Sequence, residues 1–170
     1  MKRAEQILWA LFLIAAGIKM TISRHGFYPF SAGLILSSFY FYLSFWLFNN
    51  ISFTGIFKKE NYAGITSIRI IGTIAIGFAY STAVMSILFK IMSWPGSLIM
   101  LIQSCIGLVV SGIIILVRQS KKDNGPFYKG LLLRNAILIA ICGLLIAITG
   151  LPGEQQSKIF NNPPDQKSSM

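Results

Sequence analysis

Long apolar stretches alternate with short polar ones along this chain. The clearest stretch runs from Ser97 to Val117 and contains no charged residue. As an α-helix it is long enough to cross the roughly 30 Å hydrocarbon core of a bilayer. Hydropathy defines five such segments, at about residues 4–22, 30–48, 68–89, 97–117 and 134–151. The pattern therefore predicts an all-α, polytopic membrane protein with about five transmembrane helices.

The first and last segments leave alternatives open. Met1-Lys2-Arg3 followed by an apolar stretch resembles a secretory signal peptide, but no small-residue cleavage site follows, so we expect an uncleaved first helix. The last segment is the shorter one and carries Arg134 near its start, so four spans are the alternative to five. We expect residues 1–151 to form a single helical transmembrane domain. Residues 152–170 are rich in Pro, Gln, Asn and Ser, which predicts a mobile polar tail.

Lys and Arg are distributed unequally between the two sides of this five-helix arrangement. One side would carry Lys2, Arg3, Lys58, Lys59, Arg69, Arg118, Lys121, Lys122, Lys129 and Arg134. The other side would carry half as many, namely Lys19, Arg24, Lys90, Lys158 and Lys167. Because cytoplasmic loops carry an excess of Lys and Arg, we expect a multi-pass protein of a bacterial cytoplasmic (inner) membrane. Its N-terminus would be cytoplasmic and its C-terminus periplasmic.

Small residues follow one face of the third segment and one face of the fourth, at spacings of three and four. Lipid tails supply no hydrophobic force between helices, so close backbone approach over small side chains is a main source of association. We expect a tightly packed helix hairpin, with a substrate path lined by the same residues as the alternative. Replacing Gly107 with Leu should then disrupt assembly. The predicted helix-packing residues are Gly72, Ala75, Ala79, Ala83, Ser104, Gly107 and Ser111.

The connection between these two segments is the most distinctive stretch of the chain. It reads F-K-x-x-S-W-P-G from Phe89 to Gly96. Pro95 and Gly96 end a helix and turn the chain, Trp94 suits the headgroup interface, and Lys90 can extend toward water. Physical chemistry alone thus predicts an interfacial turn here.

The same stretch resembles the F-K-x-x-H-W-P-G signature of GldL, the small membrane subunit of the gliding-motility and type 9 secretion motor of Bacteroidota. The resemblance covers about Val84 to Ile115, and in that family the motif joins two membrane helices on the periplasmic side. Ser93 stands where the family usually has His, and Leu108 stands where its second helix carries a Glu implicated in proton-driven work. Because a carboxylate in the hydrocarbon is kept there for function, the resemblance implies a related hairpin without proton-motor activity.

A weak internal repeat in the sequence bears on the predicted arrangement of the helices. Gly17-Ile18-Lys19 followed by Tyr28-Pro29 resembles Leu88-Phe89-Lys90 followed by Trp94-Pro95. Both stretches would end a helix with Lys and turn at an aromatic-Pro pair. This predicts two helix hairpins followed by a final helix.

The composition agrees with a membrane protein. Apolar residues make up 54% of the 170 residues and charged residues 12%, which leaves too little polar surface for a soluble domain. The net charge of +10 lies at the ends of apolar segments, beside anionic lipid headgroups, so we expect no nucleic-acid binding. The aromatic-rich second segment could line a pocket for a quinone or a lipid tail. Interfacial and lipid-facing packing is the simpler interpretation.

Residues that could support catalysis or hold a metal form no recognisable set. Cys105 and Cys142 lie in apolar segments without a neighbouring His, and His25 lies in the first expected outside loop. No phosphate-binding loop, G-x-S-x-G or HExxH motif is present. The carboxylates, which we place in termini or loops, are Glu5, Glu60, Asp123, Glu154 and Asp165. We expect no enzyme activity, no cofactor and no metal.

These observations favour a non-catalytic subunit or scaffold of a larger bacterial membrane assembly. Its expected partners are membrane lipids and either other membrane-protein subunits or further copies of the same chain. A small passive carrier or binding protein for a neutral or lipidic solute is the alternative, because no charged residue is expected deep in the helices to couple transport to an ion gradient.

Overall fold

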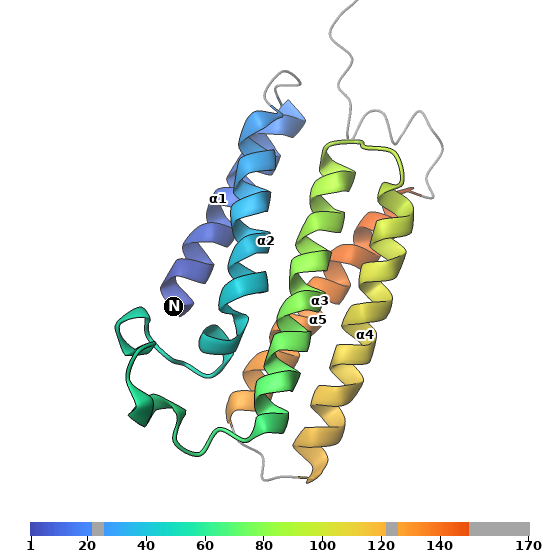
Figure 1. Ribbon diagram of the computed structural model, residues 1–170. Helices are drawn as coiled ribbons and strands as arrows, with labels where there is room; N and C mark the ends of the chain where they lie inside the picture. The colour runs from blue at the N-terminus through green and yellow to red at the C-terminus, as the bar shows by residue number, and fades with distance from the viewer. Residues whose placement is uncertain (22–25, 122–125, 150–170) are drawn as a thin grey trace, which may run out of the picture.

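The structure is a computed structural model that describes residues 1–21, 26–121 and 126–149. The described residues form five α-helices (Figure 1). The helices are α1 (Lys2–Thr21), α2 (Phe27–Phe48), α3 (Ser67–Ile91), α4 (Ser97–Lys121) and α5 (Pro126–Thr149). Two short 3₁₀ turns, η1 (Phe53–Gly55) and η2 (Lys59–Tyr62), lie between α2 and α3. The predicted all-α fold is confirmed.

Four of the helices are long and apolar enough to cross a membrane. They span Phe27–Phe48, Ser67–Ile91, Ser97–Val117 and Tyr128–Ile148. Helices suit this setting because they satisfy all of their backbone polar groups internally. The fifth predicted segment, whose spanning was left open, is therefore among the four. The described part of α1 is not among these four, and it carries the charges of Lys2, Arg3, Glu5 and Lys19.

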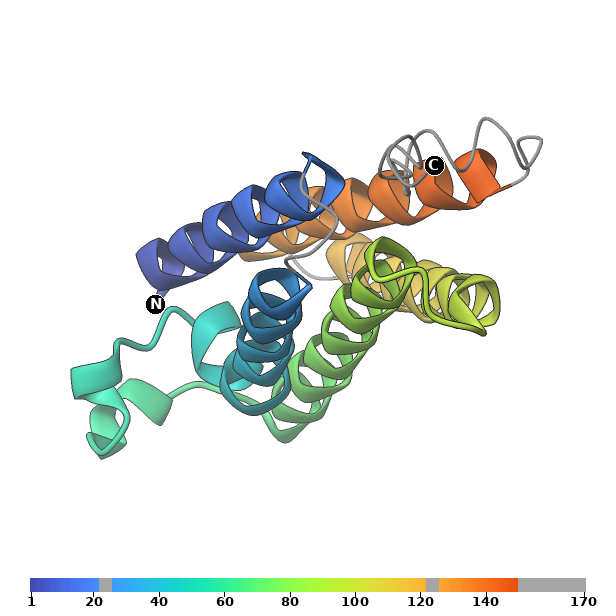
Figure 2. The same cartoon turned by 90° about the horizontal axis from the view of Figure 1, so that it is seen from above.

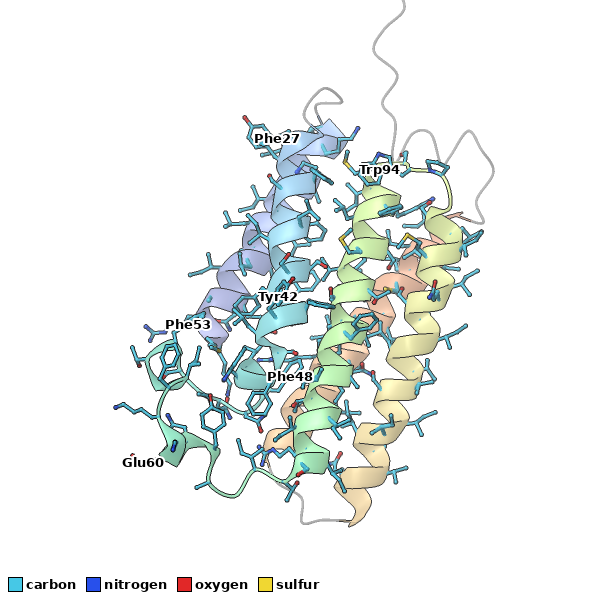
Figure 3. All side chains as sticks on the ribbon, viewed as in Figure 1. Phe27, Tyr42, Phe48, Phe53, Glu60 and Trp94 are labelled. Carbon is cyan, nitrogen blue, oxygen red and sulfur yellow. The ribbon has the colours of Figure 1, made fainter. Side chains whose placement is uncertain are left out.

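Successive helices run up and down, so the chain forms two helix hairpins followed by a single helix (Figure 1). Seen from above, α2, α3 and α4 lie in one layer, and α1 and α5 form a second layer against one face of it (Figure 2). The N-terminus and the α2–α3 connection share one end of the bundle. The turn with Trp94 lies at the opposite end, near Phe27, whereas Phe53 and Glu60 mark the first end (Figure 3).

The most extensive helix contact joins α2 and α3. Its closest approach lies at Gly77, where an added Cβ would overlap the Ser44 side chain and fall 2.9 Å from the carbonyl oxygen of Tyr40. Tyr40 and Tyr80 cross the same interface with their rings edge to face, 5.5 Å between centroids. Both tyrosines are almost fully buried. The middle of the bundle is therefore built around α2 and α3.

Large apolar side chains also cover the outside of the bundle. Exposed examples come from every helix and include Ile14, Ile35, Ile71, Ile99 and Leu144. An apolar surface of this extent is unfavourable in water and is what contact with lipid tails requires. The outer surface thus agrees with the four spans.

α5 begins at Pro126, well before the expected boundary at Arg134. Proline suits the first position of a helix because its missing N–H has no helical partner there. Arg134 lies inside the helix because Glu5 of α1 pairs with it, which the sequence pattern did not reveal. The predicted tail at 152–170, His25, and the 122–125 part of the basic loop lie outside the described residues.

Candidate functional site

The predicted turn motif forms a compact aromatic cap on the α3–α4 hairpin. The Trp94 ring packs edge to face on Phe89, 4.8 Å between centroids, and also contacts Phe30 of α2 at 5.8 Å. Ser93 and Gly96 adopt positive φ values of 55° and 79°, which reverse the chain. Pro95 is exposed at the tip of the turn.

Lys90 differs from its expected setting. We expected this side chain to extend toward water, but Lys90 is only 5% exposed and lies within the bundle end. Phe30 of α2, Phe89 of α3 and Trp94 of the turn form one aromatic cluster, so the motif also holds α2 against the α3–α4 turn.

The predicted helix-packing residues fall into two sets. Ala83, Ser104 and Ser111 are buried, and the Ser104 hydroxyl bonds the Ser86 hydroxyl of α3 at 2.8 Å. The two glycines among the others would make no close contact through an added Cβ. A Cβ at Gly107 would meet only the Ala79 Cβ at 4.0 Å, and a Cβ at Gly72 would meet no atom within 4 Å.

The second set borders an open groove on the outer side of α3 and α4, which we call the α3–α4 groove, and Ser104 and Ser111 of the first set also line it. Its volume is about 420 Å³. Gly72, Ala75, Ala79 and Gly107 lie along it, and Thr82 and Gln103 add polar groups to its wall. Gln103 is exposed, and its side chain makes no hydrogen bond to the described part of the chain. Small residues at these positions thus leave room for something outside this chain.

A polar network that the sequence analysis missed joins α1, α2 and α5. The Glu5 carboxylate pairs with Arg134 at 2.8 Å between Oε2 and Nη2. The Tyr40 hydroxyl donates to Glu5 Oε1 at 2.7 Å and accepts from the Trp9 indole N–H at 2.8 Å. Arg134 also lies over the Phe48 ring, 6.0 Å from its centroid. The available signal was a carboxylate and a guanidinium within otherwise apolar helices, a combination that favours pairing.

A second missed contact fixes α5 against α4. Asn135 is 1% exposed, and its amide donates to the Leu108 carbonyl at 2.9 Å. Its side-chain oxygen accepts from the Ser111 hydroxyl at 2.9 Å. Tyr80 adds a bond from its hydroxyl to the Leu131 carbonyl at 3.1 Å. These bonds cross between helices and set their register.

Three cavities surround the start of α5. A groove of about 530 Å³ separates α1 from α5, and we call it the α1–α5 groove. A cavity of about 350 Å³ opens at the N-terminal end of the bundle, with Lys2, Arg69 and Arg134 in its wall, and we call it the cationic cavity. Both exceed the roughly 300 Å³ at which small-molecule sites begin.

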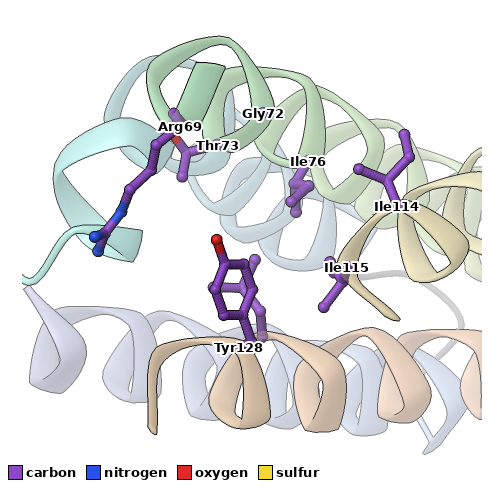
Figure 4. A pocket seen from close by; sticks show the side chains of 8 residues that line it. Arg69, Gly72, Thr73, Ile76, Ile114, Ile115 and Tyr128 are labelled. Atoms are coloured by element: carbon purple, nitrogen blue, oxygen red, sulfur yellow. The ribbon is translucent and has the colours of Figure 1, made fainter. Parts of the chain in front are cut away.

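The third cavity is much smaller, about 20 Å³, and lies between α3, α4 and α5. Tyr128 projects from α5 toward α3 there, while the guanidinium of Arg69 extends away from Tyr128 (Figure 4). Ile76 and Ile115 give it apolar walls. A space of this size suits about one water molecule and no larger ligand.

Within the described residues, no group of three or more His, Cys, Asp or Glu side chains is placed to hold a metal ion. Cys142 is buried and Cys105 is partly buried, and both thiols are free. The Cys142 thiol lies 3.9 Å from the Ser104 hydroxyl, as part of the α4–α5 packing.

The four apolar spans and the apolar outer surface define a multi-pass helical membrane protein. Comparisons with models of protein families, with curated proteins and with solved structures found no match. The resemblance of the turn at 89–96 to the GldL family rests on the residues of that turn and stays a prediction.

Proposed function

We propose that this protein is a non-catalytic subunit of a larger assembly in the bacterial cytoplasmic membrane. The α3–α4 groove would receive a transmembrane helix of a different subunit. The observation that carries this proposal is the open groove itself, in which Gly72, Ala75, Ala79 and Gly107 leave space against the lipid-facing side of two spans. Small residues let helix backbones approach closely in membranes.

Gln103 gives the groove a second feature that lipid does not satisfy. Its amide lies within the Ser97–Val117 span and makes no hydrogen bond to the described part of the chain. Polar groups facing hydrocarbon are costly, and an interhelical hydrogen bond is the usual remedy. The resemblance to a subunit of a multi-protein motor favours a partner of different sequence over a second copy.

The subunit would have no proton-motor activity of its own. Leu108, where the resembling family carries a Glu, is fully buried against the core. Among the described residues, the buried carboxylate is Glu5, and Arg134 holds it in an ion pair near the end of the bundle.

The charges at the two ends of the bundle support an orientation. The end with the N-terminus carries Lys2, Arg3, Lys58, Lys59, Arg69, Lys129 and Arg134 among its described residues, whereas Lys19 and Lys90 lie at the other end. We place the first end in the cytoplasm. Single cysteines replacing Phe57 and Pro95, in a chain without Cys105 and Cys142, test this in intact cells. An impermeant thiol reagent should label position 95 and spare position 57, and the reverse labelling would contradict the orientation.

Purification in mild detergent from the native membrane, with quantitative mass spectrometry, tests the subunit proposal. We expect a stoichiometric membrane partner with the unchanged chain and with Gly143→Leu, and loss of that partner with Gly107→Leu. Gly143 is the matched control because it is an exposed glycine of α5 where an added Cβ meets no atom within 4 Å, and at Gly107 an added Cβ meets only the Ala79 Cβ at 4.0 Å. Retention of the partner by Gly107→Leu, or its absence from the unchanged chain, would contradict the proposal.

The α1–α5 groove supports a second candidate, a passive carrier or binding protein for a lipidic solute. Its wall combines apolar side chains with the polar groups of Glu5, Trp9 and Tyr40 at one end. Solute uptake into proteoliposomes that contain only this protein would favour the carrier over the subunit.

A further inference from the structure

Arg134 borders both the cationic cavity and the α1–α5 groove. The cationic cavity lies where α1, α2, α3 and α5 meet at the N-terminal end of the bundle, and Asn50 adds an amide to its wall. The groove continues from Arg134 along α5, toward the middle of the bundle. The cationic cavity and the α1–α5 groove therefore meet at Arg134.

The walls of the groove are apolar beyond its first turn. Ala10 and Leu13 come from α1, and Ile137, Leu138 and Ile141 from α5. Glu5 to Leu13 covers about 12 Å at 1.5 Å per residue. One leaflet of the hydrocarbon core is about 15 Å deep. The groove thus has the depth and the chemistry to hold much of one acyl chain.

The charges that line the cationic cavity indicate which lipid headgroup would bind there. Lys2, Arg69 and Arg134 are cationic, and the nearby carboxylate, Glu5, is already paired with Arg134 and hydrogen-bonded by Tyr40. The described residues that line the cavity thus carry three cationic side chains and no carboxylate. Guanidinium and ammonium groups bind phosphate strongly, and anionic lipids are attracted to such clusters near the membrane surface.

We propose that the structure holds one anionic phospholipid at this place. The phosphate lies in the cationic cavity against Lys2 and Arg69, and one acyl chain lies in the α1–α5 groove. The lipid would fill the space that separates α1 from α5 and so complete the back layer of the bundle. This proposal stands on different residues from the α3–α4 groove and is independent of the subunit proposal. It shares the α1–α5 groove with the second candidate function, but here the lipid is a fixed part of the bundle and not a transported solute.

Native mass spectrometry of the delipidated protein tests the headgroup. Equimolar phosphatidylglycerol and phosphatidylcholine with identical acyl chains are added, and lipid-bound species are counted. We expect one bound phosphatidylglycerol, favoured by roughly tenfold or more. Lys2→Gln with Arg69→Gln should remove most of this preference, because each cation near the surface contributes about fivefold. Lys58→Gln with Lys59→Gln removes two exposed cations from the same end outside the cavity and should change little.

Filling the α1–α5 groove with a large side chain tests whether the acyl chain binds there. Ala10→Trp should weaken the binding of both lipids at least severalfold, whereas Ala140→Trp, an exposed alanine of α5 outside the groove, should not. Equal binding of the two lipids by the unchanged chain would overturn the proposal. An equal loss in the Lys58 and Lys59 control, or full binding by Ala10→Trp, would overturn it as well. If the double variant at Lys2 and Arg69 unfolds, the single variant Lys2→Gln is measured in its place, because Lys2 is exposed and its replacement should leave the fold intact.

Discussion

At the scale of single residues, the ion pair between Glu5 and Arg134 joins α1 to α5. Both groups lie among apolar helices, and the Arg134 side chain is 28% exposed while that of Glu5 is 7% exposed. Removing one partner of a buried pair leaves the other charge uncompensated, which typically costs 3–5 kcal/mol. Because Arg134 is partly exposed, we expect a cost near the lower limit of this range.

Glu5→Gln should therefore lower the free energy of unfolding by about 3 kcal/mol. Denaturant unfolding in mixed micelles gives this value. The double variant Glu5→Gln with Arg134→Gln should lose much less than the sum of the single variants, because neither charge is then left alone. Strictly additive losses would show that the two groups do not stabilise each other.

Asn135 makes the corresponding polar contact between α4 and α5. Asn135→Ala removes its bonds to Leu108 and Ser111 and should cost about 1 kcal/mol, within the range measured for hydrogen bonds between membrane helices. Thr82→Ala is the control, since the Thr82 hydroxyl bonds only the Phe78 carbonyl of its own helix. The same unfolding assay compares the two, and equal effects would mean that the interhelical bonds contribute nothing.

At the scale of helices, the glycines of α3 have opposite roles. Gly77 is a closest-approach position against α2, whereas Gly72 faces open space. Gly77→Ala should cost about 1–3 kcal/mol through overpacking, despite the better helix propensity of alanine. Gly72→Ala should be neutral or stabilise the protein by up to about 1 kcal/mol. Thermal unfolding of both variants checks this pair, and a destabilised Gly72→Ala with an unchanged Gly77→Ala would reverse our assignment.

The small-residue pattern predicted the hairpin faces but could not separate these roles. Spacing placed Ala79, Ala83, Ser104 and Gly107 on related faces, yet only the packed structure shows that Ala83 and Ser104 are buried while Gly107 is partly exposed in the groove. Gly77 lies off the predicted stripe, and its importance depends on Ser44 and Tyr40 of another helix. Spacing within one helix carries no information about the neighbour.

At the scale of the whole molecule, hydropathy predicted the helices well because an apolar run of bilayer length has few other solutions. It failed at the ends, where a charge is tolerated once a partner from a distant segment neutralises it. Arg134 is such a case, since its partner Glu5 lies at the other end of the sequence. The two grooves were likewise beyond prediction, because each is space between helices that only their packing defines.

The central claim is that the α3–α4 groove binds a helix of another subunit, and photo-crosslinking in the native membrane tests it most directly. A benzoylphenylalanine probe replaces either Ala75, which is exposed and lines the groove, or Ala140, which is exposed on α5 outside it. We predict a discrete adduct with a different membrane protein from position 75 and none from position 140. No adduct from position 75, the same adducts from both positions, or an adduct with a second copy alone would contradict the claim.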